Sequence, residues 1–218
     1  DAVSDEQALT TLVQGATAWH LLRTSTHLAE GETVVVHAGA GGVGTLAIQL
    51  ARRWGAGRII ATASSIEKRR LTLDLGADVA VDSTTDDLTG ELRAANGGRG
   101  VDVVLEMTGG RVFDQSLAAL APLGRLATFG MASRTPPSPV DAGRLMAHSS
   151  AVIGFWLVHV VQRPALLATA VNDLMTLIAD GSIKPVIGRR YPLEQAADAH
   201  RALLGRTSIG KLVLDPST

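Results

Sequence analysis

Three glycines carry the spacing that binds the phosphates of a dinucleotide. Gly39, Gly41 and Gly44 form the pattern G-x-G-x-x-G, directly after the apolar run 34–36 and directly before an apolar run of helical period. In this pattern the first glycine permits a tight turn, the second lets a pyrophosphate approach the backbone, and the third lets the helix pack closely on the strand. Free N–H groups at the positive end of the helix dipole then face the phosphates. The pattern therefore predicts a phosphate-binding loop at Gly39, Gly41, Gly42, Val43 and Gly44; an ordinary glycine turn in an α/β protein is the alternative.

The end of the expected second strand favours NADP(H) over NAD(H). NAD-binding units place an acid about 20 residues past the glycines, where it accepts hydrogen bonds from the ribose hydroxyls. Here that place reads A-T-A-S-S and holds no acid. Ser64 and Ser65 can donate hydrogen bonds to a 2′-phosphate, and Lys68 adds a cation one turn later. We therefore expect Ser64, Ser65 and Lys68 to bind the 2′-phosphate, although Lys68, Arg69 and Arg70 can also be interpreted as a solvated helix face.

Composition narrows the class of protein. The chain has 218 residues, 46% of them hydrophobic, and a formal net charge of −1. This balance gives no electrostatic reason to expect nucleic acid or an acidic membrane as a partner. The absence of cysteine excludes disulfides, thiolate zinc sites and a cysteine nucleophile. No apolar run reaches ~18 residues, and the start of the chain is polar and acidic, so a cytoplasmic protein is expected.

The elements that must position these residues alternate between strand and helix. This alternation, with continuously apolar strands, predicts an α/β fold built on a doubly wound, six-stranded parallel Rossmann sheet. The expected strands are 33–37, 58–62, 79–82, 101–106, 125–129 and 151–158. The expected helices between them are 43–54, 65–75, 86–95, 112–120 and 141–147.

Further elements are expected on both sides of this unit. An amphipathic helix over 5–23 precedes it, with Ser4 or Asp5 as the N-cap, and a helix over 164–180 follows it. Two more strands, 186–191 and 211–214, surround a helix at 194–204. The expected division is a linking helix over 1–30, a dinucleotide-binding domain over 31–182 and a C-terminal segment over 183–218.

Several motifs, in order along nearly the whole chain, match one family. They are Gln14 to Trp19, Val36 to Gly44, Ala61 to Ser65 with Lys68, Leu75 to Asp78, Gly100 to Val104 with Gly109 and Gly110, Gly124 with Arg125, Tyr191 to Leu193 with His200, and Gly210 with Lys211. The chain resembles the medium-chain dehydrogenase/reductase superfamily, specifically its zinc-independent quinone oxidoreductase branch, which includes zeta-crystallin-like proteins. Members of that family begin with a GroES-like domain, which forms the other wall of the active-site cleft. The resemblance implies that this chain starts at the helix leaving that domain, and that strands 186–191 and 211–214 normally complete it.

The resemblance and the fold together imply further cofactor contacts. In a doubly wound sheet the cofactor lies across the carboxyl ends of the strands. Thr108 and Gly109 are expected to border the adenosine and its ribose, and Gly130 and Met131 the nicotinamide ribose. Phe155, Trp156 and Leu157 are expected to meet the carboxamide through backbone groups. By resemblance alone, Thr17 backs the nicotinamide and Lys211 lies near the cofactor. Ser83 replaces a tyrosine that several quinone reductases place near the adenosine.

The implied activity is hydride transfer from NADPH to a small-molecule quinone or to an activated alkene such as an enone. No general acid is evident in the sequence. The chain on its own is expected to bind NADPH and to turn over little substrate. Two alternatives remain open: a non-catalytic NADP(H)-binding module, and an enoyl reductase domain of a polyketide synthase. No metal is expected, because the six histidines are scattered and cysteine is absent.

A homodimer is the expected assembly. The apolar run 150–158 is predicted to form an edge strand of the sheet, and a long apolar edge is unfavourable unless it is paired or covered. In the resembled family this edge commonly pairs with its symmetry mate. The alternative is that the helix over 164–180 covers the strand.

Overall fold

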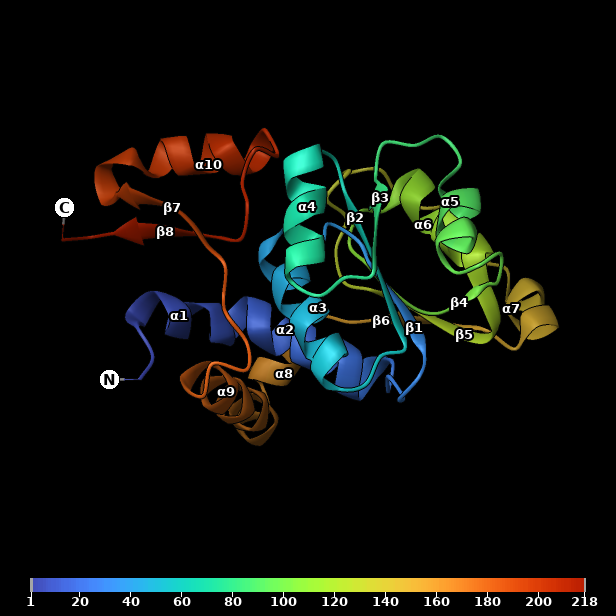
Figure 1. Cartoon of the computed structure of the whole chain (residues 1–218), viewed down its shortest axis with the longest axis horizontal. Helices are drawn as coiled ribbons and strands as arrows, with labels where there is room; N and C mark the ends of the chain where they lie inside the picture. The colour runs from blue at the N-terminus through green and yellow to red at the C-terminus, as the bar shows by residue number, and fades with distance from the viewer. Residues whose placement is uncertain (1, 218) are drawn as a thin grey trace.

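The computed structural model describes residues 2–217 and shows a six-stranded parallel sheet with helices on both faces (Figure 1). The strand order is β3-β2-β1-β4-β5-β6. The order reverses between β1 and β4, so the carboxyl ends of these two strands open a crevice where nucleotides bind in folds of this kind. The predicted doubly wound Rossmann fold is therefore confirmed. Its strands are β1 (Thr33–Val36), β2 (Arg58–Ala63), β3 (Val79–Asp82), β4 (Val101–Glu106), β5 (Leu120–Thr128) and β6 (Ala151–Gly154).

One face of the sheet is covered by the N-terminal helical segment together with α3 (Gly42–Arg53), α4 (Ile66–Asp74) and α9 (Pro164–Ala179). Their apolar sides bury leucines such as Leu22, Leu50 and Leu174 against alternate residues of the central strands. The other face is covered by α5 (Leu88–Ala95) and α6 (Gly110–Ala119), with α7 (Ala142–His148) at its margin. Because both faces are covered, β1 is buried at every position, which explains its continuous apolar run.

The helical segment before the sheet is less regular than the single helix predicted over 5–23. It consists of α1 (Asp5–Thr10), the π-helical η1 (Thr11–Gly15), α2 (Ala16–His20) and the π-helical η2 (Leu21–Ser25). Ser4 caps α1, because its hydroxyl accepts the N–H of Gln7 while the Gln7 amide accepts the N–H of Ser4. Each π turn rotates the residues that follow it relative to an α-helix.

The last part of the chain forms a two-stranded parallel sheet of its own. This sheet pairs β7 (Ile187–Pro192) with β8 (Lys211–Asp215), joined through η3 (Leu193–Gln195) and α10 (Ala196–Leu204). Figure 1 shows these elements at the end of the molecule that also holds α1. A backbone bridge between Gly41 and Gly210 connects them to the glycine loop.

Two predicted strands have a boundary several residues away from the observed one. The strand expected over 151–158 ends at Gly154, and the chain then turns into α8 (Val158–Val161). The strand ends there because its partner β5 ends at Thr128, which pairs with Gly154, and the Phe155 side chain then packs against the core on the α9 face of the sheet. The strand expected from 125 begins at Leu120, which pairs with Val101 before an irregularity in the ladder.

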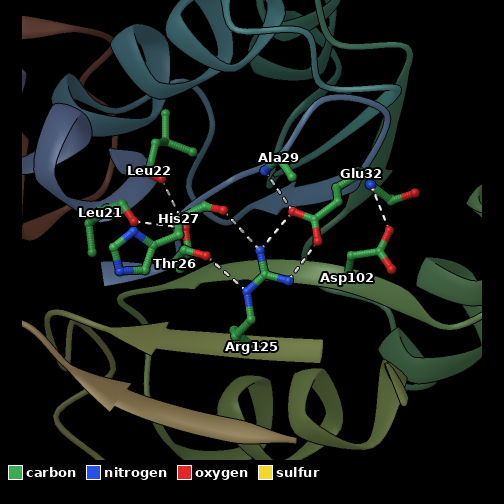
Figure 2. A network of polar contacts seen from close by, with 9 residues as sticks. Leu21, Leu22, Thr26, His27, Ala29, Glu32, Asp102 and Arg125 are labelled. Atoms are coloured by element: carbon green, nitrogen blue, oxygen red, sulfur yellow. Dashed lines mark hydrogen bonds and ion pairs between the residues drawn. The ribbon is translucent and has the colours of Figure 1, made fainter. Parts of the chain in front are cut away.

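A polar network joins the amino ends of the strands to the end of the N-terminal helical segment (Figure 2). The Arg125 guanidinium, on β5, donates to both carboxylate oxygens of Glu32 at 2.7 Å. It also donates to the backbone carbonyl of Thr26 at 2.9 Å. Beside it the Asp102 carboxylate accepts the N–H of Thr33 at 2.8 Å. The network lies at the amino ends of the strands, at the opposite end of the sheet from the glycine loop. It holds the N-terminal helical segment to the sheet.

Candidate nucleotide-binding site

The glycine loop differs in detail from the roles predicted for its residues. The left-handed residue of the turn is Ala38, with φ 49°, and not Gly39. Gly39 is required for a steric reason, since a Cβ there would lie 2.8 Å from Thr72 Cγ2 and 3.0 Å from Ala61 Cβ. A Cβ on Gly44 would lie 2.5 Å from the carbonyl oxygen of Ala38. The third glycine therefore lets α3 pack closely on the turn, whereas the prediction placed this contact on the strand.

The loop presents the start of α3 to a cavity. Gly41 is the N-cap in an extended conformation, and its carbonyl accepts the N–H of Thr45 at 2.9 Å. The N–H groups of Gly42 and Val43, in the first turn, have no acceptor within the helix. A Cβ on Gly42 would lie 2.8 Å from Gln14 Cγ, so a larger residue would push against the wall of the cavity.

The cavity has a volume of about 290 Å³. Its walls come from the glycine loop, from the carboxyl ends of β4 and β5, from η1, and from the end of α10 through β8. The lining residues are Gln14, His37, Ala38, Gly41, Gly42, Val43, Gly44, Met107, Phe129, Leu203, Ser208, Gly210, Lys211 and Leu212.

The C-terminal segment supplies one whole wall of this cavity. The N–H of Gly210 donates to the carbonyl of Ala40 at 2.8 Å, which places β8 directly against the glycine loop. Gly210 has φ 59°, and a Cβ there would lie 2.2 Å from the carbonyl oxygen of Val186. The Lys211 ammonium donates to the Gln14 side-chain oxygen at 3.3 Å. Burial lowers the pKa of Lys211.

The three residues predicted for the 2′-phosphate lie together at the carboxyl end of β2. Ser64 is exposed, and Ser65 caps α4 by accepting the N–H of Lys68 at 3.3 Å. The Lys68 ammonium donates to the backbone carbonyl of Arg206 at 2.6 Å. Arg206, in the turn after α10, was not predicted from the sequence. No local signal identifies it, because only the tertiary fold brings it next to a helix 138 residues earlier.

The loops after β4 and β5 pack against each other beside the cavity. Glu106 ends β4, and one of its carboxylate oxygens accepts the N–H groups of Thr108 and Gly109 at 2.5 and 3.0 Å. Burial raises the pKa of Glu106. Gly109 has φ 77°, and a Cβ there would lie 2.9 Å from Met131 Cγ. Thr108, Gly109, Gly130 and Met131 are thus neighbours, but they are not among the residues that line the cavity.

A buried histidine supports the floor of the cavity. His37 Nδ1 lies 2.9 Å from Thr62 Oγ1, and its Nε2 lies 2.7 Å from Ser116 Oγ. The two contacts connect β1 to β2 and to α6. Burial lowers the pKa of His37 to about 4, so the ring is neutral at physiological pH.

The residues expected at the nicotinamide end do not line the cavity. Thr17 is buried, one turn after Gln14. The Phe155 ring stacks on His20 at a centroid distance of 6.3 Å. Trp156 is 66% exposed and makes an edge contact with His159, and Leu157 is the N-cap of α8. Their assignment to the cofactor stays a prediction.

Two further findings concern metals and membranes. Within residues 2–217, no three His, Asp or Glu side chains gather in a way that could hold a metal ion. No helix in the same range has the length and apolarity needed to cross a membrane.

Comparison with known proteins places the chain in a family. The family model described as zinc-binding dehydrogenase matches residues 42–173, more than half of the chain. The chain belongs to this zinc-binding dehydrogenase family. Within the family it is similar to the quinone oxidoreductase of Pseudomonas aeruginosa, with 35% identity over 217 residues, covering 99% of this chain and 66% of that protein. The predicted membership of the quinone oxidoreductase branch of the medium-chain dehydrogenases is confirmed.

Two other similarities bear on the nucleotide and on the context of this dehydrogenase domain. A mycobacterial protein whose structure contains NADPH is 40% identical, with a TM-score of 0.91, covering 99% of this chain and 66% of that one. One chain of the phenolphthiocerol/phthiocerol polyketide synthase of Mycobacterium tuberculosis is 31% identical over 214 residues, covering 98% of this chain and 10% of that protein. The chain therefore spans just under two thirds of the quinone oxidoreductase and a small part of the synthase.

Proposed function

We propose that this chain is the NADP(H)-binding part of a cytoplasmic reductase that transfers hydride to a quinone or to an activated alkene. One observation carries the proposal. The free N–H groups at the start of α3 face a cavity of about 290 Å³, while Ser64, Ser65 and Lys68 gather at the end of β2, where NAD-binding units place an acid.

The residues of the site fit this cofactor. A pyrophosphate fits against the backbone of Gly41 and Gly42, because the loop carries no Cβ there and the helix dipole attracts an anion. Lys211 adds a cation to the wall facing the loop. When bound, NADPH supplies the hydride, and the protein's part is to hold the reacting atoms in place and to exclude water.

A second candidate function is supported by the similarity to the polyketide synthase. In that case the hydride acceptor is an enoyl thioester, and the chain is one part of a multifunctional protein. The two functions share the nucleotide site and differ in the acceptor. A comparison of a benzoquinone with an enoyl thioester, assayed on the protein with its flanking sequence, separates them by the ratio of kcat/KM.

Titration of the 218-residue chain tests the cofactor assignment directly. NADPH and NADH are added separately, and binding is followed by energy transfer from tryptophan to the nicotinamide. We expect NADPH to bind at least about tenfold more tightly, because only NADPH carries the 2′-phosphate that the serines and the lysine can bind. The Lys68→Met variant is expected to bind NADPH more weakly and to bind NADH with nearly unchanged affinity.

Equal affinity for both coenzymes in the unmodified chain would contradict the assignment. Tight NADPH binding without turnover of any acceptor by the longer protein would favour the non-catalytic module.

We also propose a homodimer through the edge strand β6. This strand is the last of the sheet, paired with β5 on one side only. Its residues Ala151, Val152 and Ile153 are apolar and only half-buried. Pairing with the same strand of a second copy would satisfy the free backbone groups of this edge.

A further inference from the structure

An acid lies close to the proposed 2′-phosphate site, one strand away from the place where NAD-binding units hold theirs. Asp82 ends β3 and pairs in register with Ala63, the last residue of β2. Neighbouring strands lie about 4.8 Å apart, and Ser64 follows Ala63 directly. The Asp82 side chain is therefore close enough to repel a phosphate bound at Ser64 and Ser65.

The Asp82 carboxylate is held in a fixed position and is ionised. One of its oxygens accepts the N–H and the hydroxyl of Thr84 at 2.9 and 2.7 Å. These hydrogen bonds, with Arg69 nearby, lower the pKa of Asp82 below its usual value. Without compensation, this charge would oppose the preference for NADP(H) that the absence of an acid on β2 creates.

Arg69 provides that compensation. Its guanidinium lies 2.8 Å from the other Asp82 oxygen and donates to the carbonyl of Ala63 at 3.2 Å. Its side chain is 22% exposed, less than that of Asp82. The Arg69 guanidinium thus contacts the ends of β2 and β3, while Lys68, one residue earlier, donates to the carbonyl of Arg206.

The local charge shows why the pair matters. Arg69 neutralises Asp82, which leaves Lys68 and the exposed Glu67, whose carboxylate is hydrogen-bonded to Ser65, as the charges beside the proposed phosphate. Without Arg69, two carboxylates, those of Asp82 and Glu67, oppose the single positive charge of Lys68 there. We propose that Arg69 sets the preference for NADP(H) indirectly, by masking the Asp82 carboxylate beside the 2′-phosphate site. This inference rests on the proposed function, since it assumes that a 2′-phosphate binds there.

Four variants of the 218-residue chain test this inference, with the dissociation constants of NADPH and NADH as the readout. Arg69→Gln is expected to weaken NADPH at least about fivefold and NADH less than about twofold, because only the 2′-phosphate meets the exposed carboxylate. Arg70→Gln is the matched control: it removes the same charge from an exposed neighbour on α4 that has no ion pair within residues 2–217, and it is expected to weaken NADPH less than about threefold.

The other two variants separate masking from direct contact. Asp82→Asn is expected to bind NADPH more tightly than the unmodified chain, and Arg69→Gln with Asp82→Asn is expected to return to within about twofold of it. If the double variant stays as weak as Arg69→Gln, Arg69 binds the phosphate itself and the inference is wrong. Equal weakening of NADPH and NADH by Arg69→Gln would also overturn it. Thermal unfolding of each variant shows that the fold is retained. If the unmodified chain does not prefer NADPH over NADH, the proposed function fails together with this inference. If the unmodified chain prefers NADPH but the variants do not behave as expected, only the inference about Arg69 fails.

Discussion

At the scale of single residues, His37 is the buried group whose titration has the clearest consequence. Its pKa is about 4 in the folded chain and 6.5 when free. Between these values the unfolded chain binds a proton that the folded chain does not, so protonation favours unfolding. The contribution of the neutral His37 ring to the free energy of unfolding is complete above pH 6.5 and is lost as the pH falls toward 4. The difference corresponds to about 3 kcal/mol.

We therefore expect the free energy of unfolding to fall between pH 6.5 and 4, and His37→Gln to remove part of that fall, since burial also lowers the pKa of His20. The variant is also expected to be less stable at pH 7, because Thr62 or Ser116 loses a partner. Urea unfolding at a series of pH values measures both effects. His148→Gln, at an exposed position, is the control and should retain the full pH dependence. An unchanged slope in His37→Gln would contradict this account.

The site roles of residues recognisable by type and spacing could be predicted from the sequence. The roles of residues that reach the site only through tertiary contacts could not. The glycines, Ser65 and Lys68 are recognisable by their type and spacing. Arg206 and Gly210 are not, because their place at the site depends on contacts across most of the chain. Arg69 was interpreted only as part of a solvated face. Its partner Asp82 belongs to another strand, and the order of residues along the chain does not show that the two are neighbours.

At the scale of elements, the Arg125 and Glu32 pair joins the loop after η2 to β5 (Figure 2). Both side chains are about one fifth exposed, so solvent screens the pair only in part. Arg125→Leu leaves the Glu32 carboxylate without its main donor and is expected to cost about 2 kcal/mol at pH 7.

The pH dependence of this effect has a definite sign. Hydrogen bonds from Arg125 lower the pKa of Glu32 below 4.5 in the folded chain. The contribution of the pair is therefore present above pH 4.5 and is lost as the pH falls through the folded value. We expect Arg125→Leu to cost less at pH 3 than at pH 7, as measured by urea unfolding, and to cost little in a Glu32→Gln background. A loss independent of pH and of Glu32 would assign the effect to packing and to the hydrogen bonds that Arg125 donates to the carbonyls of Thr26 and His27.

Element types were predicted well, and their irregularities were not. Alternating apolar runs specify strands and helices because burial imposes the period. The π turns η1 and η2 leave the apolar pattern of the segment almost unchanged, so the sequence shows one helix. The run that includes β6 is apolar through Val158, but the strand ends at Gly154, where its partner β5 also ends and Phe155 leaves the ladder to stack on His20.

At the scale of the whole molecule, the proposed dimer depends on the free side of β6. The N–H of Phe155 donates to β5 at Thr128, so by alternation the N–H of Gly154 points away from the sheet. Gly154→Pro removes this outward donor without disturbing β5, and a Cβ there would meet nothing within 4 Å. We expect Gly154→Pro to sediment as a monomer and Gly154→Ala to remain a dimer. A dimer in both variants would place the interface elsewhere.

The bridge between Gly41 and Gly210 has a consequence for where this binding unit ends. The sheet and both of its cores are complete before α10, so a truncation after Leu204 would keep every strand of the Rossmann sheet. It would nevertheless remove Ser208, Gly210, Lys211 and Leu212, and with them one side of the cavity. The smallest unit able to enclose the nucleotide is therefore larger than the smallest unit able to fold as a sheet. A boundary chosen by the Rossmann sheet alone would leave β7 without β8 and the cavity open on one side.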